Sequence, residues 1–251
     1  AGLGAGCERV GSPHARPSRV ANACVKHEPA RPQWHQARPD APKIEAVSEH
    51  LVWIDCEMTG LDLKADALVE VAALVTDGEL NVLGDGIQVV IKPSAAALEQ
   101  MNDFVRDMHS KSGLLPLLDG GMEMAEAEER VLGYIREYVR EPRKAPLAGN
   151  TIGTDRTFLA RDMPTLEGYV HYRNVDVSSI KELAHRWFPR AYYNTPAKNG
   201  NHRALADIQE SIEELRYYRE AVFVKAPGPS TAELRAIAER HRGTVTGAAA
   251  G

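Results

Sequence analysis

Two carboxylates interrupt an apolar stretch of the chain, "LVWIDCEMTGL", at residues 51–61. The stretch otherwise has the composition of a buried strand, on which side chains two residues apart face the same way. Asp55 and Glu57 are therefore predicted to project side by side, with Cys56 on the opposite face. Two buried anions repel each other and lose hydration, so the pair requires a cation, a shared proton or a basic neighbour.

Two more acids and a histidine stand where predicted helices begin. The stretch "LAGNTIGTDRTFLARDM" places Asp155 on the first turns of a helix, and "NGNHRALADIQESIEEL" places His202 before a helix and Asp207 five residues later. Taken singly, Asp155 is an ordinary acid favoured by the helix dipole, His202 a capping or surface residue, and Asp207 a solvated one. Asp207 nevertheless borders the apolar stripe of its helix, which favours a role beyond solvation.

Four carboxylates and one histidine together can form a site for the cations that would compensate the negative charge of Asp55 and Glu57. Carboxylate oxygens are the ligands that Mg²⁺ and Mn²⁺ prefer, and two such ions ~3.5 to 4 Å apart stabilise both the attacking and the leaving oxygen of a phosphoryl displacement. Asp55 and Glu57 would then face the ions. A neutral histidine, with an ordinary pKa of ~6.5, is suited to removing a proton from the attacking water.

The elements that must position these residues follow an alternating pattern. Apolar runs with turn residues between them predict strands at 51–58, 68–77 and 82–92, and shorter strands around Leu147 and Val175. Helical periodicity is found at 95–108, 124–139, 154–162, 178–187 and 205–222. The three successive strands predict an antiparallel start. The whole predicts an α/β domain with a mixed β-sheet flanked by helices.

Three regions are expected along the chain. Residues 1–46 are rich in Pro, Ala, Arg and Gly without any period, which predicts a disordered N-terminal extension. Residues 47–225 carry the strand and helix patterns and are expected to form the folded domain. Residues 226–251 open on a Pro-Gly-Pro break and are expected to be a flexible C-terminal tail with one short helix at 231–241.

Charge and cysteine content limit the classes of function. The net charge is −5, and residues 51–225 hold 20 Lys and Arg against 28 Asp and Glu, a net of −8, which argues against a long basic groove for nucleic acid. Three cysteines without zinc-ligand spacing indicate a reducing compartment. No apolar run approaches ~18 residues, so no membrane span is expected and the protein is predicted to be cytoplasmic.

Three motifs carry a specific resemblance. "WIDCEMTGL", "AGNTIGTDRTFL" and "NHRALADIQES" resemble the exonuclease motifs of the DEDDh superfamily, and residues 50 to about 225 resemble the oligoribonuclease family within it. The resemblance implies a ribonuclease H-like fold and release of 5′ mononucleotides from the 3′ end of RNA. It implies His202 as general base and, as ligands of two Mg²⁺ or Mn²⁺ ions, the four acids Asp55, Glu57, Asp155 and Asp207.

Other stretches indicate the oligoribonuclease branch. "MHSKSGL" and "YVHYRNVDVSSIKELAHRW" resemble segments that proofreading exonucleases generally lack. The resemblance implies that His109 lines the base-binding or active-site region and that Leu61 wedges between two bases. It further implies that Tyr172 and Arg173 reach a partner protomer's site or cap a 5′ phosphate, with Ser178 contributing, so a homodimer is expected. Without the resemblance, Leu61 would be interpreted as turn packing and "HYR" as an ordinary surface or dimer strand.

Competing functions remain open at this point. The preferred hypothesis is a dimeric exoribonuclease for very short RNA, dinucleotides especially. A 3′ exonuclease of the same superfamily that trims longer RNA or DNA is the close alternative. A silent RNA-binding or scaffold module is disfavoured because all five motif residues are present. The resemblance is weak in "PRAYYNTPAKNGNH" before His202, and Cys56 stands where relatives often have another apolar residue.

Overall fold

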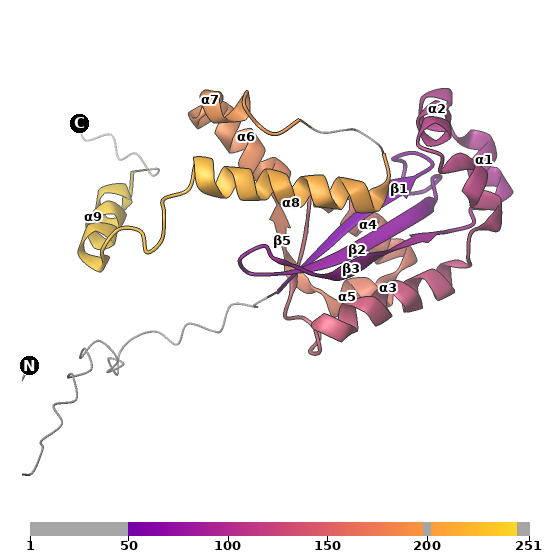
Figure 1. Ribbon diagram of the computed structural model, residues 1–251, viewed down its shortest axis with the longest axis horizontal. Coiled ribbons are helices and arrows are strands. Elements are labelled where there is room, and N and C mark those ends of the chain that lie inside the picture. Colours follow the sequence, from indigo (N-terminus) through magenta and orange to yellow (C-terminus); the bar gives the residue numbers. More distant parts are fainter. Residues whose placement is uncertain (1–49, 198–201, 245–251) are drawn as a thin grey trace, which may run out of the picture. The chain divides into compact units, whose positions relative to one another are not determined.

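A five-stranded mixed sheet forms the centre of the fold in a computed structural model, which describes residues 50–197 and 202–244 (Figure 1). The strands are His50–Met58 (β1), Leu68–Asp77 (β2), Val82–Val90 (β3), Pro146–Gly149 (β4) and His171–Asp176 (β5). Their order is β3-β2-β1-β4-β5. The first three strands are antiparallel, and β4 and β5 run parallel to β1. The predicted mixed sheet with an antiparallel start is confirmed.

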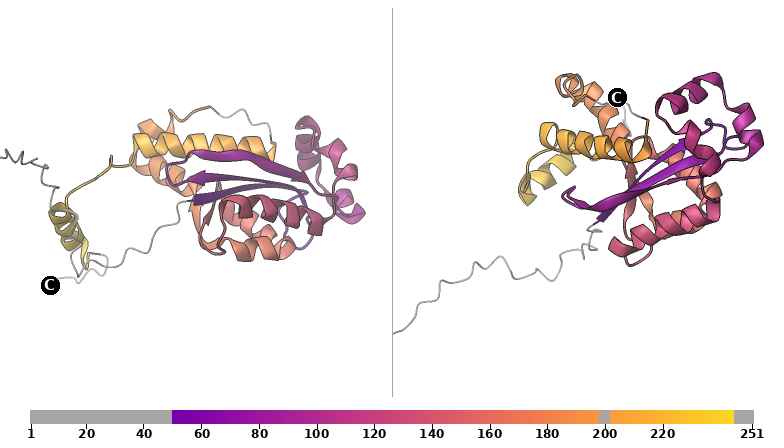
Figure 2. Two further views of the ribbon diagram at one scale, coloured as in Figure 1. Left: turned by 60° about the horizontal axis from the view of Figure 1, so that its bottom comes forward. Right: turned by 45° about the vertical axis from the view of Figure 1, so that its right-hand side comes forward.

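Helices cover both faces of this sheet. They are Ala95–Gln100 (α1), Asp103–Lys111 (α2), Met124–Tyr138 (α3), Ile152–Asp162 (α4), Pro164–Tyr169 (α5), Val177–Trp187 (α6), Pro189–Tyr192 (α7), Ala204–Ala221 (α8) and Thr231–His241 (α9), with a 3₁₀ turn at Leu115–Gly120. Figure 2 shows α8 on one face and α3 with α5 on the other. None of the described helices is long and apolar enough to cross a membrane.

Strand alternation decides which side chains face which helices. On β2, Val71 and Val75 pack into the cluster formed with α3, α4 and α5, whereas Leu74 packs into the cluster formed with α6 and α8. On β1, Trp53 belongs to the α8 side and Cys56 to the other. The predicted orientation of Cys56 is therefore confirmed, and the odd-numbered acids of β1 share the side of Trp53.

Two details differ from the pattern in the sequence. The helix expected at 95–108 is interrupted, because Met101 leaves the helical conformation. Asn102 has an extended backbone and caps the next helix by accepting a hydrogen bond from Val105 N at 3.0 Å. Three short elements, the 3₁₀ turn, α5 and α7, were not predicted because they are too short to show a period. The expectation for residues 1–46 lies outside the described residues, whereas the short helix expected at 231–241 is confirmed.

The position of α8 matters most for the candidate site. Its apolar stripe, Ile208, Ile212, Leu215 and Tyr218, packs with Trp53 in one buried cluster. The helix lies across β1, β2 and β3. Its first residues thereby come to the end of β1 that carries Asp55 and Glu57.

Candidate active site

The last residues of β1 place two carboxylates on the α8 side of the sheet. Glu57 is only 9 % exposed, and Asp55 is half-buried. Burial is the main cause that raises the pKa of Glu57 from its ordinary value to about 8, and the neighbouring carboxylates Asp207 and Glu70 add to it. Burial, followed by repulsion from Asp155 and Glu57, raises the pKa of Asp55 well above its ordinary value.

Helix α4 brings Asp155 to the same point from a distant part of the chain. Asp155 is 7 % exposed, and its Oδ1 accepts a hydrogen bond from the backbone N–H of Cys56 at 3.0 Å. This bond ties the first turn of α4 to the residue between Asp55 and Glu57. Burial raises the pKa of Asp155 to about 7, although the bond from Cys56 acts in the opposite direction.

The start of α8 supplies the remaining two residues. Ligand atoms of Glu57, His202 and Asp207 all lie within 4.8 Å of one another. His202 has a left-handed backbone with φ of 48°, which turns the chain immediately before the helix. Three elements that are far apart in sequence thus converge on one cluster of acids with a histidine at its edge.

The arrangement fits a hard divalent cation. Half-buried and buried carboxylates that repel one another are stabilised when a cation takes the place of the missing counter-charge. Carboxylate oxygens are the ligands that suit Mg²⁺ and Mn²⁺. Arg203 is a basic neighbour that lowers the pKa of Glu57, but its effect on that carboxyl is smaller than those of burial, Asp207 and Glu70. The fold therefore leaves this acid cluster short of positive charge.

His109 lies behind the cluster. Its ring is fully buried, with Nε2 2.8 Å from the carbonyl oxygen of Met58 and Nδ1 3.9 Å from Oε2 of Glu57. Full burial leaves no open ring face for a stacked base. Of the two roles expected for His109, its position therefore favours lining the active site over binding a base.

The other predicted substrate residues lie at the surface. Leu61, in the turn after β1, is 75 % exposed, which excludes the alternative that it packs within the turn. Tyr172 is 73 % exposed on the edge strand β5, and the guanidinium of Arg173 lies 5.5 Å from the centre of its ring. Ser178 is already engaged, since its hydroxyl donates to Asp176 at 2.6 Å. Among the described residues, no hydrogen bond or ion pair joins Tyr172 or Arg173 to the acid cluster.

Sequence analysis did not single out two features of this region. Glu70 is a fully buried carboxylate directly opposite Glu57 in the β1–β2 ladder. A lone acid within the apolar run "LVEVAALVTD" was the signal for it. Phe104 on α2, five residues before His109, is 79 % exposed. An exposed aromatic on the helix that contacts the end of β1 is a candidate surface for a base.

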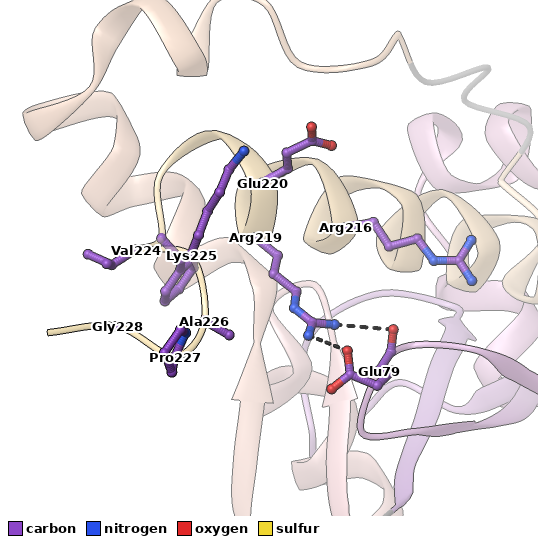
Figure 3. Close-up of a pocket in the computed structure, with 10 residues that line it drawn as sticks. Glu79, Arg216, Arg219, Glu220, Val224, Lys225, Ala226, Pro227 and Gly228 are labelled. Carbon is purple, nitrogen blue, oxygen red and sulfur yellow. Dashed lines mark hydrogen bonds and ion pairs between the residues drawn. The ribbon is translucent and has the colours of Figure 1, made fainter. Parts of the chain in front are cut away.

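A cavity of about 680 Å³ lies at the opposite end of α8 (Figure 3). Both arginines that line it are already engaged within the protein. Arg219 pairs with Glu79, and Arg216 donates to the carbonyl oxygen of Leu80 at 2.5 Å. This cavity shares no lining residue with the acid cluster and is not a candidate for the same chemistry.

Comparisons with known proteins agree with this geometry. The RNase_T family, described as exonuclease, matches residues 52–215. The oligoribonuclease of Streptomyces coelicolor is 68 % identical over 195 residues, which cover 78 % of this chain and 98 % of the relative. The oligoribonuclease of Cutibacterium acnes is 67 % identical over 198 residues, which cover 79 % of this chain and 98 % of the relative.

Solved structures show the fold. The metal-free E. coli ExoI–ssDNA complex aligns with a TM-score of 0.53 at 17 % identity, covering 69 % of this chain and 40 % of the other. Exonuclease I without ligand aligns with a TM-score of 0.54 at 16 % identity, covering 70 % and 43 %. This chain thus spans less than half the length of those exonucleases, and the likeness concerns the shared ribonuclease H-like domain.

Proposed function

The chain belongs to the oligoribonuclease family of exonucleases, and from this premise we propose that it hydrolyses short RNA, dinucleotides especially, from the 3′ end to 5′ mononucleotides. The observation that carries the proposal is the convergence of Glu57, His202 and Asp207 within 4.8 Å at the end of β1. The hydrogen bond from Cys56 to Asp155 brings a further acid to this place. Asp55, which precedes Glu57 by two residues on β1, has a pKa raised by burial and by the charges of Asp155, Glu57 and Asp207, and this supports its inclusion in the same cluster.

In this proposal the four carboxylates Asp55, Glu57, Asp155 and Asp207 hold two divalent ions, Mg²⁺ or Mn²⁺. Such ions activate the attacking water and stabilise charge on the reacting phosphate and the leaving oxygen. The raised pKa values of Glu57 and Asp155 support a site built for cations, because burial without a counter-charge is unfavourable to carboxylates.

His202 acts as the general base. It is exposed at the rim of the cluster, where a water and a substrate phosphate can reach its ring. An imidazole nitrogen there can accept a proton from the attacking water and release it to solvent afterwards. Its place one residue before the N-cap of α8 holds it next to Asp207 without burying it.

The predicted residues outside the acid cluster bind the substrate. Leu61 and Tyr172 offer apolar and aromatic faces to splayed bases, and Arg173 with Ser178 binds a terminal phosphate. We further propose that a homodimer brings Tyr172 and Arg173 to the partner's acid cluster. Support comes from β5 being an edge strand, with its central residues exposed. Arg156 stiffens that edge by donating to the carbonyl oxygens of His171 and Tyr172.

The cellular location in this proposal is the cytoplasm, where short RNA arises from decay. The one cysteine among the described residues, Cys56, is free and buried, as in proteins of reducing compartments.

A competition between substrates tests the function. A 5′-phosphorylated RNA dinucleotide and a longer RNA labelled at its 5′ end are supplied at equal concentration with Mn²⁺ or Mg²⁺. The proposal predicts rapid loss of the dinucleotide while the long strand is nearly untouched. Efficient stepwise shortening of the long strand would instead assign the protein to the trimming branch of the superfamily. Loss of neither substrate would contradict both.

A further inference from the structure

The N-terminus of α8 has no cap from its own sequence. The residue at the N-cap position is Arg203, whose side chain has only donors and accepts no hydrogen bond from the helix. The first backbone N–H groups of a helix need acceptors when they are not in water. Ala204, the first residue of α8, is fully buried, so its N–H group must find an acceptor within the protein.

Two side chains from the sheet supply those acceptors. Glu70 on β2 accepts from the N–H of Ala204 at 3.1 Å, and Gln88 on β3 accepts from the N–H of Leu205 at 3.3 Å. The two side chains are themselves joined, since Gln88 Nε2 donates to Glu70 Oε1 at 2.9 Å. The helix is thus capped across the sheet by residues more than a hundred positions away.

Arg203 completes this arrangement. Its Nη2 lies 2.9 Å from Glu70 Oε1, and its Nε donates to the same oxygen at 3.2 Å. Glu70 is fully buried, and a buried carboxylate is tolerated only when it is paired and fully hydrogen-bonded. Glu70 lies opposite Glu57 and is thus the acid of β2 next to the cluster, and its pairing with Arg203 neutralises it.

This cap lies between the two functional residues of the third motif. His202 directly precedes Arg203, and Asp207 follows one turn later, with its N–H bonded to the carbonyl oxygen of Arg203 at 3.1 Å. Fixing Arg203, Ala204 and Leu205 therefore fixes where His202 and Asp207 stand relative to β1. We propose that Glu70, Gln88 and Arg203 are positioning residues that set the register of the active site by capping α8 from the sheet. This inference rests on the proposed function for its kinetic readout.

A purely structural role is less consistent with the packing. The buried stripe of Ile208, Ile212, Leu215 and Tyr218 already anchors α8. Apolar residues at positions 70 and 203 would hold the helix with a similar free energy of folding, because replacing a buried ion pair by packed apolar side chains is often neutral. What an apolar pair could not supply is a fixed acceptor for Ala204 N–H, and hence the local position of the first turn.

The test compares two carboxylate caps. Glu70→Gln removes the charge and one acceptor but keeps the shape of the side chain. Glu128→Gln is the matched control, because Glu128 Oε1 on α3 caps α5 in the same way, accepting from Thr165 N at 2.6 Å and Leu166 N at 3.0 Å on the other face of the sheet. Each variant is measured for melting temperature, for Mn²⁺ affinity by calorimetry, and for kcat and KM on an RNA dinucleotide.

We expect Glu70→Gln to lower both Mn²⁺ affinity and kcat by roughly 10- to 100-fold, the usual effect of losing a group that orients a ligand, with KM nearly unchanged. Glu128→Gln should lower the melting temperature while leaving Mn²⁺ affinity and kcat near wild type. Gln88→Leu, which keeps the Glu70 to Arg203 pair but removes the acceptor for Leu205, should show the same pattern as Glu70→Gln to a smaller extent. It also carries the test if Glu70→Gln does not fold.

Wild-type levels of Mn²⁺ affinity and kcat in both Glu70→Gln and Gln88→Leu would overturn the inference, as would equal losses in Glu128→Gln. Failure of the proposed function is distinguishable from this. If wild-type protein does not cleave the dinucleotide, the Mn²⁺ titration still decides whether Glu70 positions Asp207, because that readout needs no substrate.

Discussion

The acid cluster and the exposed edge strand β5 differ in how their side chains are held. The acids come from β1, α4 and α8, and backbone contacts such as the bond from Cys56 N–H to Asp155 fix them within one chain. On β5, Tyr172 and Arg173 are exposed, and the contact between them is a cation over a ring. The chemistry is thus assembled by folding, whereas the substrate surface is left open for a nucleotide or a second copy of the chain.

The difference has a physical reason. Catalytic groups must be held rigidly and partly out of water, where fixed charges act strongly. A side chain that stacks on a base contributes to binding through the surface that the bound base buries. Such a side chain must therefore be exposed before the substrate binds. Variants in the two regions should therefore fail in different ways.

The largest effect is expected from the acids. Asp55→Ala or Asp207→Ala should reduce turnover by roughly three orders of magnitude or more, because metal-held stabilisation of the transition state is worth several kcal/mol. Circular dichroism and the melting temperature should stay near wild type, since a mutually repelling carboxylate has been removed. Turnover near wild type in both variants would refute the metal assignment.

His202→Ala should lower kcat by about 10²- to 10⁴-fold, the range for loss of a general base. Its effect on Mn²⁺ affinity should be much smaller, because a base acts mainly in the transition state. Single-turnover kinetics with saturating Mn²⁺ separates the two quantities. An unchanged kcat would remove His202 from the mechanism.

On β5, Tyr172→Ala should raise KM for a dinucleotide by on the order of 5- to 150-fold, corresponding to about 1–3 kcal/mol for one stacked base. The Mn²⁺ affinity should not change. Phe223→Ala is a suitable control, because Phe223 is 51 % exposed at the other end of α8. Equal losses of affinity in both variants would show that Tyr172 has no specific contact with the substrate.

The smallest effect concerns stability without metal. Burial raises the folded-state pKa values of Glu57 and Asp155 to about 8 and about 7, above their ordinary values. Groups with raised pKa values stabilise the fold at low pH, and this contribution is lost as pH rises through the folded-state values. In chelator, the melting temperature should therefore fall as pH rises toward about 8. Mn²⁺ should restore it at the upper end, and a melting temperature independent of both would contradict the cluster's electrostatics.

Sequence reasoning succeeded where the determinants are local. Alternation along β1 predicted that Cys56 faces away from Asp55 and Glu57, and periodicity predicted α8 to within one residue at each end. It failed for Glu70 and Gln88, because their role depends on the register of β2 against β3 and on where α8 crosses them. The burial of His109 was equally inaccessible, since it follows from the packing of α2 on the end of β1.

Complementation between variants tests the contrast between the two regions most directly. Asp207→Ala and Tyr172→Ala proteins are mixed, subunit exchange is confirmed, and hydrolysis is measured at a dinucleotide concentration far below the KM of Tyr172→Ala, where each variant alone is slow. If Tyr172 serves the partner's acids, each mixed dimer has one complete site, and random exchange in a symmetric dimer should restore about a quarter of wild-type activity. Mixing Asp207→Ala with Asp55→Ala should restore no activity, because each site takes all its acids from one chain and neither chain has the complete set. That second mixture is therefore the control that must stay inactive if the chemistry is built within one chain. Recovery in the control, or none in the first mixture despite exchange, would contradict the account.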